Sequence, residues 1–255
     1  MKICATGLAA LMVIPACATA VPDELAGETA TDDLGGDGKA DSAVNGVYTY
    51  YAITADTRKC PAPACGGFFV KRLNRSTTWC VDGSGADSCY TPVLDWHEAN
   101  LSDALQAKLV ATATVDASNP GVHAIVRGRF APTNTTPQPE LGRFVVTEGW
   151  LAENTAVASG VFVKVFDNGT RCITEPCPWL TERGVNLSRS AVIDDVDWDY
   201  ADWNADDIAV MTAELTTPSG LLMAGNRYEV VDGGHQTIGR TCTQAYYRLA
   251  DAAAQ

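Results

Sequence analysis

A short cysteine loop that occurs twice constrains the fold of this chain more than any other feature of its sequence. The loop CPAPAC spans residues 60–65 and the loop CITEPC spans residues 172–177, so each cysteine pair encloses four residues. A Thr-Arg step comes shortly before each loop, and an asparagine stands nine positions after its second cysteine, at Asn74 and Asn186. Equal spacings of this kind indicate an internal repeat.

The agreement extends beyond the two loops. An Asp-Trp pair ends at Trp96 in the first half and at Trp198 in the second, 31 and 21 positions after the preceding loop. The ten extra residues match the size of the Gly- and Asp-rich stretch Cys80–Cys89, which has its own cysteine pair. We therefore predict two homologous repeats, residues 46–155 and 156–255, the first carrying an insertion.

Hydrophobic patterns predict the same order of elements in each repeat: a strand, the cysteine loop, a second strand, one helix and two closing strands. The fold class is α+β and strand-rich, with about four strands and one helix in each half and a pseudo-twofold relation between the halves. The expected strands cover residues 47–53, 68–73, 122–130, 143–150, 161–166, 179–185, 221–231 and 242–249.

Each expected helix begins at a residue suited to the N-cap position, Ser102 in the first half and Asn204 in the second. Acidic residues follow in the first turn, where they interact favourably with the positive end of the helix dipole. The apolar residues of each helix recur on one stripe, which should face a core; they are Leu101, Leu105 and Leu109, then Ile208, Met211 and Leu215.

The first 20 residues have the character of a secretory signal, with Lys2, an apolar run over residues 5–16 and then small residues. Two cleavage sites stay open. The first, Ile14-Pro15-Ala16-Cys17, resembles the bacterial lipoprotein box, after which Cys17 becomes lipidated. The second, Ala18-Thr19-Ala20, is an ordinary A-x-A site that leaves Val21 first. We favour lipidation of Cys17, which predicts an exported protein that meets the membrane through its N-terminal lipid only.

Residues 21–45 should form an acidic, flexible tether between that anchor and the folded body. They hold seven carboxylates and one lysine. Such a segment cannot bury enough apolar surface to offset the entropy of ordering it. A calcium site in this segment is an alternative interpretation, but a solvated linker is the ordinary one.

Seven cysteines remain after Cys4 and Cys17 are set aside. Export leads to an oxidising compartment, so close pairs should be disulfides. The expected pairs are Cys60–Cys65, Cys80–Cys89 and Cys172–Cys177, which leaves Cys242 as a possible free thiol. Alternatives are a zinc site built from the two loops and a thioredoxin-like redox pair, although the latter requires two intervening residues instead of four.

The stretches RKCPAPACGGFFVKRLN, from residue 58, and GVFVKVFDNGTRCITEPCPW, from residue 160, carry a resemblance to a known family. They resemble an uncharacterised domain family with duplicated cysteine loops, a domain of unknown function, found in predicted lipoproteins of myxobacterial type. The resemblance implies no activity. It favours the lipoprotein interpretation of Cys17, and hence an outer-membrane lipoprotein or a secreted or periplasmic protein.

The net charge of −13 argues against nucleic acid and anionic lipid headgroups as partners. The sequence contains no H-E-x-x-H, G-x-S-x-G or S-x-x-K motif. Alternating Asp195, Asp197 and Asp199 resemble part of a calcium loop, but Tyr200 replaces the glycine that such a loop needs. We therefore expect no cofactor, no metal and no enzymatic activity.

Three functional hypotheses follow. The first is a non-enzymatic binding or structural protein of the envelope, with an envelope protein or glycan as partner. The second is a secreted enzyme with an unrecognised site between the halves. The third is a protease inhibitor that presents Arg58 and Lys59 beside the stapled loop.

Overall fold

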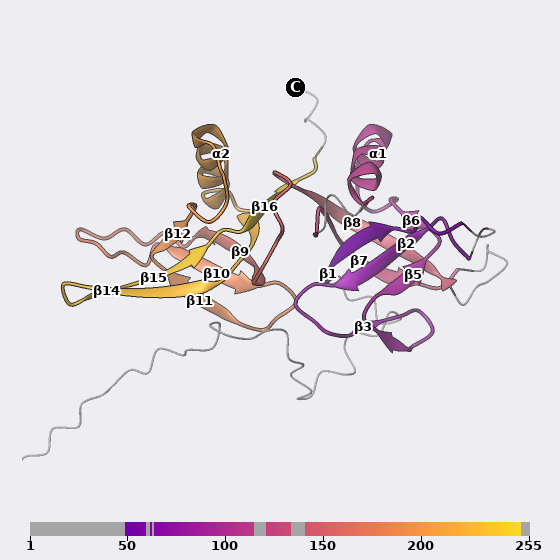
Figure 1. Ribbon diagram of the computed structural model, residues 1–255, viewed down its shortest axis with the longest axis horizontal. Helices are drawn as coiled ribbons and strands as arrows, with labels where there is room; N and C mark the ends of the chain where they lie inside the picture. The colour runs from indigo at the N-terminus through magenta and orange to yellow at the C-terminus, as the bar shows by residue number, and fades with distance from the viewer. Residues whose placement is uncertain (1–48, 60–61, 63, 115–120, 134–140, 251–255) are drawn as a thin grey trace, which may run out of the picture.

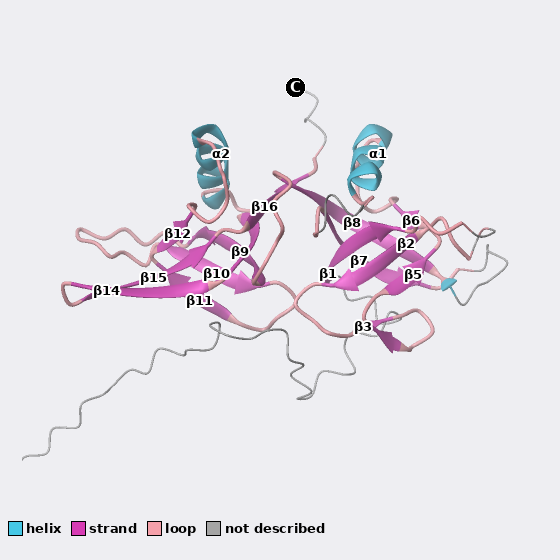
Figure 2. Cartoon of the chain, viewed as in Figure 1, coloured by secondary structure: helices cyan, strands magenta, loops and turns pink. Residues whose placement is uncertain are grey.

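The computed structural model describes residues 49–59, 62, 64–114, 121–133 and 141–250 (Figure 1). It is mostly β-sheet, with two helices (Figure 2). The elements in chain order are β1 (Thr49–Ala55), β2 (Phe68–Arg72), β3 (Thr78–Trp79), β4 (Gly85–Ala86), β5 (Cys89–Thr91), β6 (Leu94–Asp95), α1 (Asp103–Thr112), β7 (Ala124–Ala131), β8 (Arg143–Ala152), β9 (Val161–Asp167), β10 (Leu180–Gly184), β11 (Ser190–Ile193), β12 (Asp195–Asp197), α2 (Ala205–Leu215), β13 (Leu221–Gly225), β14 (Arg227–Asp232), β15 (His235–Thr241) and β16 (Gln244–Arg248).

One large sheet runs through the described part of the chain, in the order β11-β10-β9-β13-β16-β8-β7-β1-β2-β5. Strand β6 adds to it by pairing in parallel with β8. The central β16–β8 pair is antiparallel, with Tyr246 opposite Ala152 and Arg248 opposite Trp150. Strands β13, β9, β10 and β11 follow outward on one side, and β7, β1, β2 and β5 follow on the other. The sheet is therefore continuous across the middle of the chain.

Both helices cover the same face of this sheet (Figure 1). Leu109 of α1 packs into a core with Phe144 and Leu151, and Met211 of α2 packs into a second core with Val163. Successive side chains of a strand point to opposite faces, so the residues between these core positions face away from the helices. We call that side the helix-free face.

A third core lies on the helix-free face at the centre of the sheet. Trp150, Leu222 and Tyr246 are buried there and are covered by Leu73 and Val185. The last two residues belong to the turns that follow β2 and β10. This core therefore joins strands from both ends of the chain.

Asn74 and Asn186 follow those covering residues, and each reaches into the other half of the chain. Asn74 Nδ2 donates to the carbonyls of Phe162 (2.7 Å) and Val185 (2.8 Å), and the Phe162 N–H donates to Asn74 Oδ1 (2.9 Å). Asn186 Nδ2 donates to the carbonyls of Tyr50 (2.7 Å) and Leu73 (3.0 Å), and the Tyr50 N–H donates to Asn186 Oδ1 (2.9 Å).

Both asparagines have a positive φ, 55° for Asn74 and 58° for Asn186, a conformation that asparagine adopts more readily than most residues. The asparagine nine residues after each cysteine loop therefore lies in a turn that is hydrogen-bonded to the opposite half.

The expected four strands in each half are too few. The structure has sixteen strands in its described residues, because β3 to β6 and β12 are only two or three residues long and leave little periodicity. The single strand expected over residues 221–231 is also wrong: β13 ends at Gly225, and β14 starts a separate sheet ordered β12-β15-β14. The expected strand over residues 242–249 starts two residues later, after β15.

A buried ion pair lies between the two sheets of the second half. Arg240 of β15 pairs with Glu182 of β10, and both side chains are fully buried. Arg240 Nη1 also donates to the Gly225 carbonyl at 2.7 Å. The guanidinium therefore connects β15 both to β10 and to the point where β13 ends.

Both helices begin where the sequence predicts, with one difference in capping. Asn204 Oδ1 accepts a hydrogen bond from the Asp207 N–H at 2.9 Å, which caps α2. Ser102 occupies the same position before α1 but makes no side-chain hydrogen bond to the helix. Leu109, Met211 and Leu215 are buried as the apolar stripes predicted.

Two disulfides lie wholly within the described residues, Cys80–Cys89 with a Cα–Cα distance of 5.4 Å and Cys172–Cys177 with 5.6 Å. Cys65 is also disulfide-bonded, while its expected partner Cys60 lies outside the described residues. Cys242 is a buried free thiol. The signal at residues 1–20, with Cys17, and the tether at residues 21–45 lie outside the described residues as well.

Candidate anion-binding site

A group of polar side chains lies on the helix-free face where strands from both halves meet. We call this group the polar cluster; it consists of Tyr50 (β1), Arg127 (β7), Glu148 (β8), Lys164 (β9) and Arg248 (β16). It holds three cations and one carboxylate. The surroundings are thus locally basic, although the chain as a whole has a net charge of −13.

Strand alternation explains why these side chains share one face. Lys164 stands between Val163 and Val165, which are both buried in the core beneath α2. Glu148 precedes Gly149, whose Cα faces Leu109 of α1, so Glu148 itself points the other way. Arg127 is opposite Glu148 in the β7–β8 register, next to a β-bulge.

The carboxylate of Glu148 connects two of the three cations. Its Oε1 accepts a hydrogen bond from Arg127 Nη1 at 2.7 Å, and its Oε2 lies 3.7 Å from Arg248 Nε. The Arg127 guanidinium also lies over the ring of Tyr50, 5.8 Å from its centroid. Glu148 therefore fixes the positions of the two arginines but neutralises only one charge.

Lys164 is the cation of the cluster that has no ion-pair contact within the described residues. Its side chain is half-buried and makes no hydrogen bond or ion pair within the described part of the chain. Burial lowers the pKa of its amine below the ordinary value, and the charges of Arg248, Arg127 and Arg183 lower it further against the opposing effect of Glu148. Burial likewise raises the pKa of Tyr50, with Glu148 adding to the shift.

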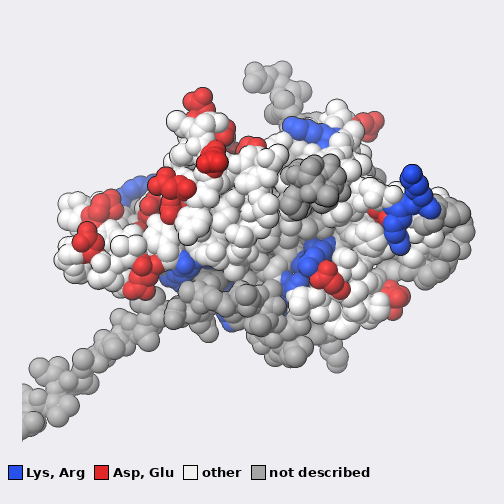
Figure 3. Space-filling view, in the orientation of Figure 1, with Lys and Arg blue, Asp and Glu red and all other residues white. Residues whose placement is uncertain are grey.

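The charge of the two halves differs. Residues 156–255 carry 14 acidic and seven basic side chains, and residues 46–155 carry ten acidic and nine basic ones. Figure 3 shows acidic side chains gathered over the end of the molecule that carries α2. The polar cluster is thus a basic site within a largely acidic surface.

Arg58, which the inhibitor hypothesis names, contacts a residue before its own cysteine loop and one within it. Its Nε and Nη2 each lie 2.8 Å from the buried carboxylate of Asp56, and Nη2 donates to the Ala64 carbonyl at 3.3 Å. The guanidinium also lies over the rings of Phe69 and Tyr90. These hydrogen bonds lower the pKa of Asp56. Lys59 is exposed like Arg58, but it makes no hydrogen bond or ion pair within the described residues.

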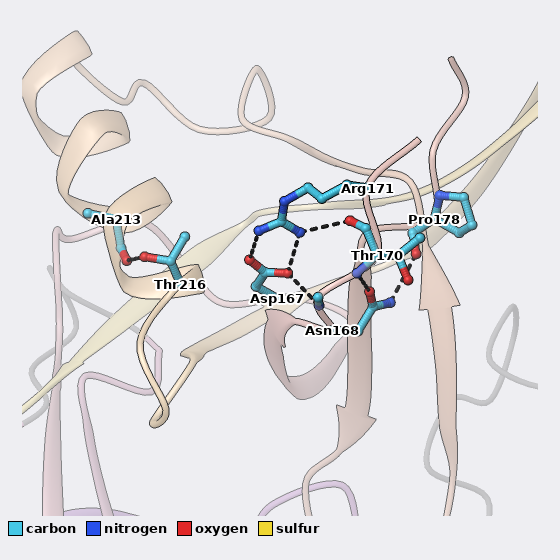
Figure 4. Close-up of polar contacts among 8 residues, drawn as sticks. Asp167, Asn168, Thr170, Arg171, Pro178, Ala213 and Thr216 are labelled. Atoms are coloured by element: carbon cyan, nitrogen blue, oxygen red, sulfur yellow. Dashed lines mark hydrogen bonds and ion pairs between the residues drawn. The ribbon is translucent and has the colours of Figure 1, made fainter. Parts of the chain in front are cut away.

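The second cysteine loop has a comparable pair (Figure 4). Arg171 Nη1 and Nη2 lie 2.9 and 2.5 Å from the two oxygens of Asp167, and Nη1 also donates to the Thr170 carbonyl at 2.7 Å. Hydrogen bonds from Arg171, and then from the Gly169 N–H, lower the pKa of Asp167 to about 2. The arginine that comes shortly before each loop thus has a structural contact that accounts for its position.

A separate hollow of about 350 Å³ lies in the first half, beside β6 and the start of β8. Asp95 and Arg143 face each other there at 3.4 Å, next to Trp96. The hollow does not lie between the halves, where the second hypothesis expected an enzyme site. The described residues also contain no group of three or more His, Cys, Asp or Glu side chains close enough to hold a metal ion.

Sequence reasoning missed all five residues of the polar cluster. The signal that was available is a charged residue inside an otherwise apolar strand, as in VFVKVFD around Lys164 and AIVRGRF around Arg127. Such a residue by default faces solvent in a one-sided sheet. Only the strand order across the two halves brings these residues together.

Among the described residues, no helix is both long and apolar enough to span a bilayer. The disulfides are typical of a compartment outside the cytoplasm. The chain belongs to the family described as a domain of unknown function, DUF6748, whose profile matches residues 49–252. No curated protein and no solved structure shows significant similarity to it.

Proposed function

We propose that this chain is an exported, lipid-anchored envelope protein that binds a ligand carrying carboxylate or phosphate groups, without catalysing a reaction. The observation that supports this proposal most directly is Lys164, a half-buried cation without a partner in the described residues, beside Arg127 and Arg248. An envelope protein with acidic side chains or an acidic glycan has the required chemistry.

The energetic argument concerns the cost of burying a charge. The partly buried ammonium of Lys164 loses hydration that no hydrogen bond within the described residues replaces, and the neighbouring cations add repulsion. An anionic ligand would supply the missing counter-ion. Charge-assisted hydrogen bonds of this type contribute about 1.5–3 kcal/mol each, which corresponds to roughly tenfold or more in affinity.

The proposed location rests on the N-terminal sequence and on the disulfides. Residues 1–20 read as a signal, and Cys17 stands where a lipoprotein box needs its cysteine. Lipid on Cys17 would hold the body near the membrane through the acidic residues 21–45. If cleavage leaves Val21 first instead, the same protein is secreted or periplasmic and the proposed binding site is unchanged.

We also infer that the two halves arose by duplication and are related by a pseudo-twofold axis. The strand order outward from β16–β8 supports this, since β13, β9 and β10 of the second half stand where β7, β1 and β2 stand in the first. The reciprocal contacts of Asn74 and Asn186 support it further, because Asn186 stands 112 positions after Asn74 and Phe162 stands 112 positions after Tyr50.

Calorimetric titration of the purified protein with tri-galacturonate and with inorganic phosphate tests the binding proposal. A neutral galactose trisaccharide serves as the ligand control. We expect an acidic probe, but not the neutral one, to bind, and the variant Lys164→Met to lose about tenfold in affinity. Lys108→Met is the matched control, since Lys108 lies on α1 at the other face. If neither acidic probe binds, or if Lys164→Met binds like the control, the proposal is wrong.

An enzyme with its site between the halves is the second candidate, and the lowered pKa of Lys164 favours it. A desolvated lysine near other cations is a suitable nucleophile for carbonyl substrates. Treatment with glyoxylate and cyanoborohydride should then label Lys164 faster than Lys108, as measured by peptide mass spectrometry. Equal labelling of the two lysines would leave binding as the only supported role.

A further inference from the structure

The polar cluster lies where the chain enters the sheet. Strand β1 begins at Thr49, which is opposite Gly128, and Tyr50 of the cluster is opposite Arg127. Whatever precedes β1 therefore joins the folded body within one residue of the cluster. The sequence places the acidic residues 21–45 there, ending four residues before Thr49.

The charges of the two parts are complementary. The segment 21–45 carries seven carboxylates and one lysine, a net charge of −6. The cluster carries three cations and one carboxylate, and the exposed Arg183 adds a fourth cation near Lys164.

The covalent path is long enough for contact. Asp41 is nine residues from Tyr50, a span of at most about 30 Å when extended and about 17 Å on average for a flexible chain. A tether of this length keeps its charges at an effective concentration in roughly the millimolar range near the cluster. Several ion pairs formed together, with a combined dissociation constant below about a millimolar, are then sufficient for substantial occupancy.

We propose that the acidic segment 21–45 binds the polar cluster within the same molecule and competes there with the anionic ligand. The competition rests on the proposed function, whereas the contact between the segment and the cluster requires no external ligand. The segment would act as a built-in competitor, so that only ligands with several correctly spaced anionic groups displace it.

Zero-length crosslinking of the purified protein with a carbodiimide tests the contact directly. The reagent joins a carboxylate to an amine only when the two groups touch. We expect peptide mass spectrometry to find Lys164 linked to carboxylates of residues 21–45, and Lys108, on the helix-covered side, to remain free of such links. Absence of a link between Lys164 and the segment overturns the proposal.

A mixture of ¹⁵N-labelled and unlabelled protein identifies the source of the carboxylate. Links within one isotopic species support the intramolecular contact. Links between species in the proportion expected for random pairing overturn it, and they would assign the segment of a second copy as the occupant. Raising the salt concentration to about 1 M should suppress the specific links, because exposed ion pairs are then screened within about 3 Å.

The competition is measured by titrating tri-galacturonate into two charge variants of the full chain. A segment that occupies the cluster about nine-tenths of the time lowers the apparent affinity about tenfold. Neutralising it should therefore raise the affinity by about that factor at low salt. The test variant changes Asp32, Asp33, Asp37 and Asp41 to Asn, and the matched control changes the exposed Asp103, Asp199, Asp202 and Asp206 to Asn.

The two experiments separate the failure of this inference from the failure of the proposed function. A crosslink at Lys164 without any binding of tri-galacturonate or phosphate supports the contact with the acidic segment and refutes the proposed anion-binding function. If the acidic probe binds both charge variants with equal affinity and no crosslink forms, the proposed function is supported and the competing role of the acidic segment is refuted.

Discussion

Replacing Asn74 by alanine should destabilise this protein more than its single, half-exposed side chain suggests. Three hydrogen bonds across the two halves would be lost, two from Nδ2 and one to Oδ1. Each net contribution is about 1 kcal/mol, and the groups left behind are partly buried, so the loss should total about 3 kcal/mol. Alanine at a φ of 55° adds about 1 kcal/mol of backbone strain.

Two matched variants separate these contributions. Asn74→Gly keeps the conformational freedom and removes the hydrogen bonds, so it should cost about 3 kcal/mol. Asn100 also has a positive φ, 50°, but is exposed and makes no side-chain contact across the halves. The variant Asn100→Ala should therefore cost only the strain, about 1 kcal/mol.

Urea unfolding followed by tryptophan fluorescence gives the free energy of unfolding of each variant. We expect the order Asn74→Ala, then Asn74→Gly, then Asn100→Ala, from the most to the least destabilised. Asn186→Ala should match Asn74→Ala to within about 1 kcal/mol, since it loses the reciprocal set of three bonds. If Asn74→Ala costs no more than Asn100→Ala, the contacts across the halves do not stabilise the fold as reasoned here.

Four further predictions concern other parts of the molecule. Asp167→Asn should destabilise the protein at pH 7 but not near pH 2. The lowered pKa of Asp167 contributes stability above about pH 4, and this stability is lost as the pH falls towards 2. Thermal unfolding of both proteins at several pH values measures the difference. Cys242, whose pKa burial raises to about 12, should react with iodoacetamide only after unfolding, as peptide mapping will show. Arg240→Met should cost about 3–5 kcal/mol in urea unfolding by leaving Glu182 buried and unpaired, whereas Arg240→Met combined with Glu182→Met should recover most of that loss. If the protein inhibits trypsin, Lys59→Ala should abolish inhibition, since Lys59 is exposed and, unlike Arg58, makes no hydrogen bond or ion pair within the described residues. Inhibition that survives the change would exclude this loop as the contact.

Local patterns in the sequence predicted the elements that are long and periodic. Helix α2 begins after Asn204 as its capping residue indicated, and its apolar stripe faces a core. The hairpin β14–β15 was missed, although Gly233-Gly234 between two β-rich runs is a typical turn signal. Asn226, between β13 and β14, was read as part of one strand, because nothing local shows that the chain leaves one sheet there and starts another.

The spacing of Asn74 and Asn186 was visible in the sequence, but the function of these residues was not. Their equal distance from the cysteine loops indicated a repeat. Their hydrogen bonds, in contrast, depend on how the turn of each asparagine packs against a strand of the other half. Long-range contacts of this kind have no local signature. The same limitation applies to Glu182 and Arg240, which are 58 positions apart and would each be expected on the surface.

The polar cluster differs from these contacts in a way that bears on function. Contacts that hold the fold occur in both halves, as with Tyr50 and Phe162, which each exchange hydrogen bonds with an asparagine of the other half. Shifting Lys164 back by the same 112 positions gives Ala52, which is buried and apolar. A structural requirement of the repeat would place a similar residue at both positions. If the halves arose by duplication, as we propose, the repeated fold does not explain Lys164, and the anion that we propose on the helix-free face, a ligand or the acidic segment, is consistent with its position and charge.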